Sequence, residues 1–207
     1  EMKIAIIGAS SFVGLNLIKE LKKRNYFITA TYNNQKMKML KSNRIIWKKL
    51  DIRQNKKNFY EFLGAPDVVI NLAWRDIPNY LSKRHFETFQ IQKKFNNNLI
   101  KNGLKNLIIL GTCYEYGNVK GEISERKTCK PNIPYSKAKL QLLNFIQKKK
   151  EDYNFKFTWL RPFFVYGYNK KRETLFSLIK KINQGKKIKI DVPGKLKRDF
   201  ISVNYLN

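Results

Sequence analysis

The chain has 207 residues, enough to bury a core as one domain or as one domain and part of another. It contains no apolar run of about 18 residues, so no membrane span is expected. The net charge of +28 raises nucleic acid as a partner, but 34 of the 43 basic residues are Lys and they are spread along the whole chain. That spread argues against nucleic acid as the principal partner.

The first expected element is an almost wholly apolar strand over residues 2–8, typical of a parallel strand buried on both faces. A Gly/Ser turn and an amphipathic helix with basic C-terminal residues follow. Gly8 permits the turn, Gly14 lets the helix approach the strand, and amides at the helix N-terminus can bind a pyrophosphate. Ser11 stands where a Gly is frequent and adds a hydroxyl donor. This order predicts a dinucleotide-binding opening.

The second expected strand covers residues 26–32. In an NAD site, an acidic residue near the end of this strand binds the ribose 2′-hydroxyl. The sequence here is Tyr-Asn-Asn-Gln-Lys, without a carboxylate. Asn33 and Lys36 can accommodate a 2′-phosphate, so the sequence favours NADP, while NAD stays open because Lys36 also fits the general excess of lysine.

Strands and helices then alternate to residue 203, which indicates an α/β fold with a doubly wound parallel sheet. A long helix is expected from Ser82, its N-cap, with His85 on the solvated surface. Its expected apolar spine is Phe86, Phe89, Phe95, Leu99 and Ile100. The further expected strands are 44–50, 68–72, 106–111, 155–160 and a short one near 188–190, and the further helices are 58–63, 135–150 and 174–185.

Tyr135 and Lys139 are four residues apart at the start of one of these helices, so both side chains share a face. A nearby ammonium favours phenolate, and we expect Lys139 to lower the Tyr135 pKa from about 10 towards the range of a general acid or base. A single Tyr-x-x-x-Lys arises by chance in so lysine-rich a chain. The pair therefore gains meaning only from the other motifs.

Several motifs in register resemble the extended short-chain dehydrogenase/reductases, which include nucleotide-sugar epimerases, dehydratases and 4-ketoreductases. They are Gly8-x-x-Ser-x-x-Gly14, Leu50-Asp51, Asn71-Leu-Ala-Trp74, Thr112 five residues before Gly117, Tyr135-x-x-x-Lys139, Arg161-Pro-Phe-Phe-Val-Tyr-Gly167 and Arg198-Asp-Phe-Ile. The resemblance implies a Rossmann fold, with residues 1–167 as the NAD(P)-binding domain. Residues 168–207 would then begin a small substrate-binding region that continues further in the family.

The resemblance also implies roles for individual residues. Tyr135 would exchange a proton with the substrate oxygen, Lys139 would hold the nicotinamide ribose and tune Tyr135, and Thr112 would hydrogen-bond the same oxygen. Tyr114 would contact the substrate and Arg198 would neutralise the diphosphate of a nucleoside-diphosphate sugar. The implied cofactor-binding residues are Gly8, Ser10, Ser11, Phe12, Val13, Gly14, Asn33, Lys36, Asp51, Ile52, Leu72, Ala73, Trp74, Tyr135, Lys139, Pro162 and Phe163.

The departures narrow the activity. Dehydratases carry Asp-Glu directly after the catalytic Thr, where this chain has Cys113 and Tyr114, and Glu115 comes one residue too late. A 4,6-dehydratase is therefore not expected. The segments Asn71-Leu-Ala-Trp74, Pro78-Asn-Tyr80 and Thr112-Cys-Tyr-Glu-Tyr-Gly117 resemble a sugar 4-ketoreductase subgroup more than the galactose 4-epimerases. This resemblance implies a 4-keto-6-deoxysugar reductase of surface-polysaccharide precursor synthesis. The alternatives are a 4-epimerase with tightly bound NAD and a non-catalytic cofactor-binding relative.

The cysteines indicate the cellular compartment, and the family resemblance indicates the oligomeric state. Cys113 and Cys129 provide neither a disulfide framework nor a metal site, Cys113 is expected to be a packing residue, and no leader is evident. We expect a reducing cytoplasm and no metal. The helices 82–103 and 135–150 commonly pair between subunits in the family, which implies a homodimer.

Overall fold

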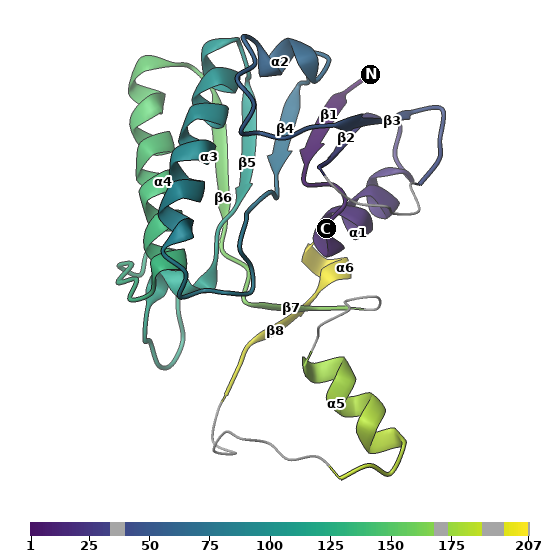
Figure 1. The fold of residues 1–207 in the computed structure, drawn as a ribbon, viewed down its shortest axis with the longest axis vertical. Helices are drawn as coiled ribbons and strands as arrows, with labels where there is room; N and C mark the ends of the chain where they lie inside the picture. Colours follow the sequence, from purple (N-terminus) through teal and green to yellow (C-terminus); the bar gives the residue numbers. More distant parts are fainter. Residues whose placement is uncertain (34–39, 168–173, 188–196, 207) are drawn as a thin grey trace.

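A six-stranded parallel sheet forms the centre of the computed structural model, which describes residues 1–33, 40–167, 174–187 and 197–206. The strands follow the order β3-β2-β1-β4-β5-β6 (Figure 1). Their bounds are β1 (Lys3–Ile7), β2 (Phe27–Tyr32), β3 (Ile45–Lys49), β4 (Val68–Asn71), β5 (Asn106–Leu110) and β6 (Lys156–Leu160). The order reverses between β1 and β4, and ligands of such sheets bind at this reversal, beyond the carboxyl ends of the strands.

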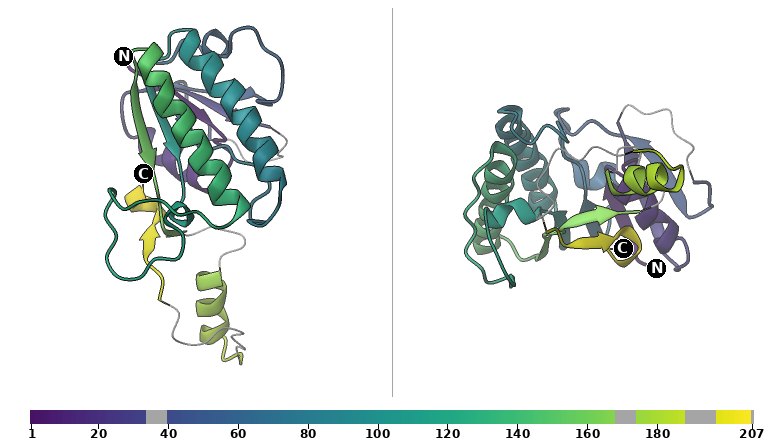
Figure 2. Two further views of the ribbon diagram at one scale, coloured as in Figure 1. Left: turned by 90° about the vertical axis from the view of Figure 1, so that its left-hand side faces the viewer. Right: turned by 90° about the horizontal axis from the view of Figure 1, so that it is seen from below.

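Helices cover both faces of the sheet. The helix α1 (Phe12–Leu21) packs on one face, and α3 (Arg84–Lys101) and α4 (Pro134–Asp152) lie side by side on the other (Figures 1 and 2). Alternate side chains of β1 divide between two cores, Ile4 and Ile6 towards α1 and Ala5 and Ile7 towards the α3 and α4 face. Burial on both faces explains why β1 is apolar throughout. The short helix α2 (Phe59–Phe62) precedes β4.

The buried face of α3 differs in part from the predicted spine. Phe95, Leu99 and Ile100 are buried as expected, whereas Phe86 and Phe89 are only half-buried. The first half of the face is polar instead, with Thr88 and Gln92 among its buried residues. The helix begins at Arg84 and its N-cap is Lys83, so the prediction of Ser82 as the N-cap is wrong by one residue, although the Ser82 hydroxyl accepts the Arg84 N–H at 3.3 Å.

The last part of the described chain forms a separate two-stranded ladder. Strands β7 (Phe164–Tyr166) and β8 (Phe200–Ser202) pair in parallel, and α6 (Val203–Leu206) packs against α1. Gly167 follows β7 and lies against α6 and α1. A Cβ on Gly167 would lie 2.5 Å from Val203 Cγ1 and 3.0 Å from Phe12 Cζ, so a larger residue does not fit there. The sequence did not predict β7 or α6, and the strand expected near 188–190 falls outside the described residues.

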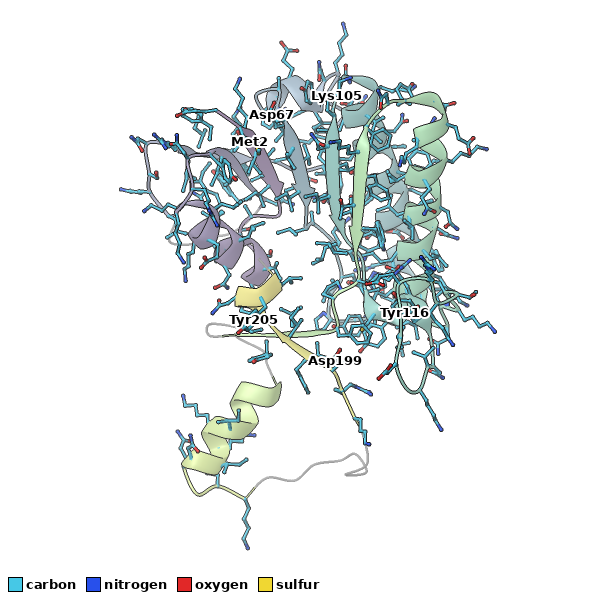
Figure 3. The ribbon with its side chains drawn as sticks, turned by 180° about the vertical axis from the view of Figure 1, so that it is seen from behind. Met2, Asp67, Lys105, Tyr116, Asp199 and Tyr205 are labelled. Carbon is cyan, nitrogen blue, oxygen red and sulfur yellow. The ribbon has the colours of Figure 1, made fainter. Side chains whose placement is uncertain are left out.

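The ladder lies at the carboxyl end of the sheet. In Figure 3, Met2, Asp67 and Lys105 are labelled at the amino end of the main sheet, and Tyr116, Asp199 and Tyr205 lie beyond its carboxyl end. The helix α5 (Thr174–Asn183) extends beyond the ladder, away from the sheet (Figures 1 and 2). In the described part of the chain, no helix is both long and apolar enough to cross a membrane.

Candidate active site

The loop between β1 and α1 has the geometry of a phosphate-binding turn. Gly8 takes a φ of 75°, which side chains disfavour, and its carbonyl accepts the Ser11 N–H at 3.0 Å. A Cβ on Gly14 would lie 2.6 Å from the Ala9 carbonyl oxygen, so only Gly allows this approach of helix to strand. The Ser11 hydroxyl accepts the Gly14 N–H at 3.1 Å and caps α1, a role that the sequence reading missed.

A cavity of about 260 Å³ lies beside this loop, at the reversal of strand order. Its lining includes nine of the predicted cofactor-binding residues, Gly8, Ser10, Ser11, Asn33, Asp51, Ile52, Leu72, Ala73 and Trp74. The structure thus gathers a phosphate-binding turn, an acidic strand end and an aromatic ring in one crevice, and this set of groups fits a dinucleotide.

Four other predicted cofactor residues, Phe12, Val13, Pro162 and Phe163, are not part of the cavity lining. Phe12 and Val13 form the start of α1 and are half-buried. Pro162 and Phe163 follow β6 and pack on the turn that follows β5, because the Pro162 carbonyl accepts the Cys113 N–H at 3.2 Å and the Phe163 ring stacks on that of Tyr116. Lys36 lies outside the described residues.

The Asp51 carboxylate is held by Arg53. The Arg53 Nε atom lies 2.9 Å from both carboxylate oxygens, and a further bond comes from its Nη2. This hydrogen bonding lowers the pKa of Asp51, against the opposing effect of its burial. Asp51 is therefore ionised at neutral pH and stands at the cavity wall with a fixed orientation.

A buried amide network supports the wall formed by residues 71–73, and sequence reasoning missed it. Gln92 on α3 donates from Nε2 to the Ala73 carbonyl at 2.6 Å, and Asn71 Nδ2 donates to Gln92 Oε1 at 2.8 Å. Asn96 joins through its own bonds to Gln92 and Asn71. The available signal was the pair of amides one turn apart on a helix beside a strand that ends in Asn.

Tyr135 and Lys139 lie in the first two turns of α4 and are 6% and 4% exposed. Lys139 Nζ donates to the Leu110 carbonyl, at the end of β5, at 2.5 Å. The same Nζ lies 4.0 Å from the ring centroid of Trp74 and 6.0 Å from that of Tyr135. The predicted helix face therefore meets the cavity wall at Trp74.

Burial controls the pKa values of both groups. Desolvation raises the pKa of Tyr135, the nearby Tyr80 adds to this, and a hydrogen bond with the Thr112 side chain opposes it. Burial lowers the pKa of Lys139 to about 7, against the attraction of Glu115. The expectation that Lys139 lowers the Tyr135 pKa is wrong for this structure, because the ammonium is itself desolvated and donates to a backbone carbonyl.

Thr112 follows β5 and caps the short 3-10 helix η1 (Cys113–Tyr116). It is 6% exposed, its hydroxyl accepts the Tyr114 N–H at 3.4 Å, and its side chain is near enough to Tyr135 to lower the pKa of that phenol. The structure thus brings the three predicted catalytic residues together at the carboxyl end of β5. Two neighbouring hydroxyls beside a buried amine can hold one substrate oxygen and exchange its proton.

His85 is fully buried beside this group, so the expectation of a solvated side chain is wrong. Trp74 Nε1 lies 3.1 Å from His85 Nδ1, and His85 Nε2 lies 2.9 Å from the Asn79 carbonyl oxygen. The imidazole and Tyr135 rings have centroids 5.1 Å apart. The segment between β4 and α3 folds over the imidazole and provides both hydrogen-bond partners, which sequence position alone does not indicate.

Two predicted substrate residues, Tyr114 and Arg198, lie along a row of aromatic rings that starts at Tyr135. We call the rings of Tyr80, Tyr114 and Phe164 the aromatic wall. Ring centroids lie 5.2 Å apart for Tyr135 and Tyr80, 5.3 Å for Tyr80 and Tyr114, and 6.2 Å for Tyr114 and Phe164. The exposed Arg198 guanidinium lies 5.1 Å from the Phe164 ring centroid. An arginine at the far end of this wall is suited to an anionic group.

The model of the NAD dependent epimerase/dehydratase family matches residues 4–204. The chain belongs to this family. The candidate site lies where the doubly wound sheet of this chain reverses its strand order.

Two relatives are similar over most of the chain. The dTDP-6-deoxy-L-talose 4-dehydrogenase (NAD(+)) of Aggregatibacter actinomycetemcomitans is 24% identical over 196 residues, covering 87% of this chain and 67% of that protein. The UDP-glucose epimerase YtcB of Bacillus subtilis strain 168, described as uncharacterized, is 29% identical over 222 residues, covering 98% and 69%.

A solved structure supports the fold. The UDP-N-acetylglucosamine 4-epimerase of Methanobrevibacter ruminantium M1, in complex with UDP-N-acetylmuramic acid, superposes with a TM-score of 0.85 at 21% identity. The match covers 100% of this chain and 70% of that one. The doubly wound fold predicted from the sequence is confirmed.

Proposed function

We propose that the protein is an NAD(P)-dependent oxidoreductase that acts at C4 of a nucleoside-diphosphate sugar, and that its reaction is reduction of a 4-keto-6-deoxysugar. The observation that carries the proposal is the meeting of Thr112, Tyr135 and Lys139 beside a cavity with a phosphate-binding turn. The similarity to a dehydrogenase named for position 4 of a dTDP-6-deoxy sugar supports this reaction.

The chain's own groups fit a reduction. A bound nicotinamide would supply hydride-transfer chemistry at the sugar carbon. Tyr135, which burial keeps protonated at neutral pH, would give its proton to the ketone oxygen, and Thr112 would hold that oxygen in place. Lys139 titrates near neutrality, and in its charged form it would stabilise the phenolate left on Tyr135.

The cofactor would lie along the cavity, with its diphosphate at the Gly8 loop and its adenosine near Asp51. A preference for NADP rests on the exposed Asn33 in the lining and on the lack of a carboxylate after β2, whereas one relative is named with NAD(+). Comparing the Kd of NADPH with that of NADH tests the preference. Asn33→Asp should shift the ratio of the two towards NADH.

The second candidate is a 4-epimerase, favoured by the epimerase names of two similar proteins. The third is a relative that binds the cofactor without turnover. The cofactor behaviour separates the first two, because an epimerase regenerates its cofactor in place and retains NAD through purification, while a reductase exchanges it.

The test is NAD(P)H oxidation by the purified protein with a panel of 4-keto-6-deoxy nucleotide sugars. Reduction of at least one, with reversible cofactor binding, is the expected result. Interconversion of C4 epimers without net oxidation would establish the epimerase instead. Tight cofactor binding with neither reaction would establish the non-catalytic relative.

Two structural expectations complete the proposal. Residues 1–167 would hold the cofactor, and residues 168–207 would contribute to the substrate side, where Arg198 stands. The adjacent helices α3 and α4 would pair with those of a second copy in a homodimer. Light scattering of the purified chain at several concentrations tests the dimer, and a monomer mass at every concentration would refute it.

A further inference from the structure

The carboxylate of Glu115 is completely buried behind the turn that carries Thr112. One oxygen accepts the Thr112 N–H at 2.9 Å. The other accepts Trp159 Nε1 at 2.9 Å and Arg161 Nε at 2.6 Å, and Trp159 also lies 3.2 Å from the first. Three donors from two separate segments therefore converge on one carboxylate, which is fully hydrogen-bonded.

These donors tie the turn to the end of β6. Trp159 belongs to β6 and Arg161 follows it, whereas Thr112 follows β5. A Cβ on Gly111 would lie 2.3 Å from Trp159 Nε1 and 2.7 Å from Glu115 Oε1, so the indole and the carboxylate fill the space directly behind the backbone. The Thr112 backbone is thereby fixed on the side away from Tyr135, the residue whose pKa the Thr112 side chain lowers.

Stability alone is a weak reason for such a group. Removing two charges from water costs much of what their attraction returns, and apolar residues of similar volume often replace a buried ion pair without loss. What the carboxylate provides is direction, because its bonds fix the position of one specific backbone N–H. That N–H belongs to the residue predicted to hold the substrate oxygen.

We propose that Glu115 is a positioning residue: its carboxylate fixes the Thr112 backbone and so holds the Thr112 hydroxyl in place against Tyr135. Glu115 is not an acid or base in the reaction, since its oxygens are occupied by Trp159 and Arg161. The inference rests on the proposed function for its effect on turnover, but the fixed turn can also be measured without any substrate.

The first experiment is a double-mutant cycle between Glu115→Gln and Thr112→Val, in which kcat, KM and cofactor Kd are measured. Glu115→Gln should lower kcat by about tenfold or more, because small misplacements of a positioned group are costly, and should leave the cofactor Kd unchanged. In the Thr112→Val background, the same change should lower kcat less than about twofold, since the hydroxyl that it positions is gone. An equal fall in both backgrounds overturns the inference.

The second experiment uses the turn's own thiol. Cys113 is half-buried, and burial raises its pKa to about 11, so alkylation of the folded turn is slow. In a Cys129→Ser background, Cys113 is the sole cysteine, and Glu115→Gln should raise its rate of alkylation by iodoacetamide by about tenfold through local opening. The control is Ile146→Ala, which destabilises the core near the far end of α4 and should leave this rate unchanged.

The two experiments fail in different ways. An unchanged Cys113 rate overturns the inference whatever the enzyme does. Absence of turnover in the unmutated protein counts against the proposed function, and the thiol rate then decides the inference alone. If Glu115→Gln does not fold, Arg161→Lys, which keeps the charge but loses the planar fork, should change kcat and the thiol rate in the same directions.

Discussion

Trp74 Nε1 donates to His85 Nδ1 at 3.1 Å, so the single histidine of the chain orients the indole on which the Lys139 ammonium lies. The bond to His85 Nδ1 assigns the ring proton to Nε2, which faces the Asn79 carbonyl. The same imidazole packs against the Tyr135 ring. The buried His85 side chain therefore contacts both Trp74, which lines the cavity, and Tyr135, the predicted proton donor.

Replacing this imidazole should affect both stability and turnover. His85→Phe keeps the ring packing but leaves the Trp74 N–H without its acceptor, which should cost about 1–3 kcal/mol in unfolding free energy. A shifted Trp74 should also lower kcat by about tenfold. The matched control is Thr88→Ala on the same buried face, whose hydroxyl donates to the Arg84 carbonyl of its own helix, and kcat should there change less than about twofold. Urea denaturation and steady-state kinetics measure the two effects, and an unchanged kcat in His85→Phe would refute a role for His85.

The buried Lys139 predicts a specific dependence of stability on pH. Burial disfavours the charge and lowers its pKa in the fold from the ordinary lysine value of 10.5 to about 7. Below pH 7 both states are charged and the fold bears the full desolvation cost. Between about pH 7 and 10.5 only the unfolded state keeps the proton, so the unfolding free energy rises with pH, by at most about 1.4 kcal/mol per unit.

Lys139→Met should remove this rise. Denaturation of both proteins from pH 6 to 10 should show a difference, variant minus wild type, that is largest at pH 6 and shrinks above pH 7. The control is Lys137→Met, because Lys137 is exposed on the same helix and has no desolvation cost to relieve. Parallel curves for wild type and Lys139→Met would contradict the burial of a titrating ammonium.

Gly14→Ala should disrupt the start of α1. The added methyl would lie 2.6 Å from the Ala9 carbonyl oxygen, so the helix must shift away from β1. We expect a loss of about 2–3 kcal/mol in unfolding free energy and a clearly weaker affinity for the cofactor. Gly121→Ala meets no atom within 4 Å and bears only the strain of its φ of 77°, so it should cost about 1 kcal/mol and leave cofactor affinity unchanged. Equal cofactor affinity in the two variants would show that the α1 loop does not hold the diphosphate.

Arg198→Gln should raise the KM for the nucleotide sugar by about tenfold or more without changing the Kd of the cofactor. The guanidinium stands at the end of the aromatic wall, where charge-assisted bonds to a diphosphate are possible. Lys197→Gln removes one positive charge from the adjacent exposed residue and controls for the general field of this basic chain. Similar KM values for the two variants would assign the effect to net charge alone.

The fold was largely predictable because its signals are local. Apolar runs, Gly turns and the spacing of Gly8 and Gly14 identified the strands of the main sheet, α1 and the crevice. The strand β7 was missed because its partner β8 lies far along the chain and only the pairing makes it a strand. The need for Gly at position 167 likewise could not be predicted, because it depends on contact with Val203, which is distant in the sequence.

The site was predictable as a set of residues but not as an environment. The motifs placed Thr112, Tyr135 and Lys139 together, yet the pKa of Tyr135 depends on desolvation, which spacing along a helix does not report. His85 was predicted to be solvated, but the structure buries it because the preceding segment provides its two hydrogen-bond partners, Trp74 and Asn79. Glu115 was predicted not to serve as a dehydratase acid, but its bonds to Trp159 and Arg161 join distant segments and could not be predicted.

Tyr135→Phe gives the most direct test of the central claim, because it removes one hydroxyl and preserves the ring packing against Trp74 and His85. The measurement is single-turnover oxidation of NAD(P)H by the 4-keto nucleotide sugar on which the wild type is active, together with the Kd of the cofactor. The account predicts that the rate falls by about a thousandfold or more while the Kd changes less than about threefold. A rate equal to that of the wild type would contradict the assignment of Tyr135 as the proton donor.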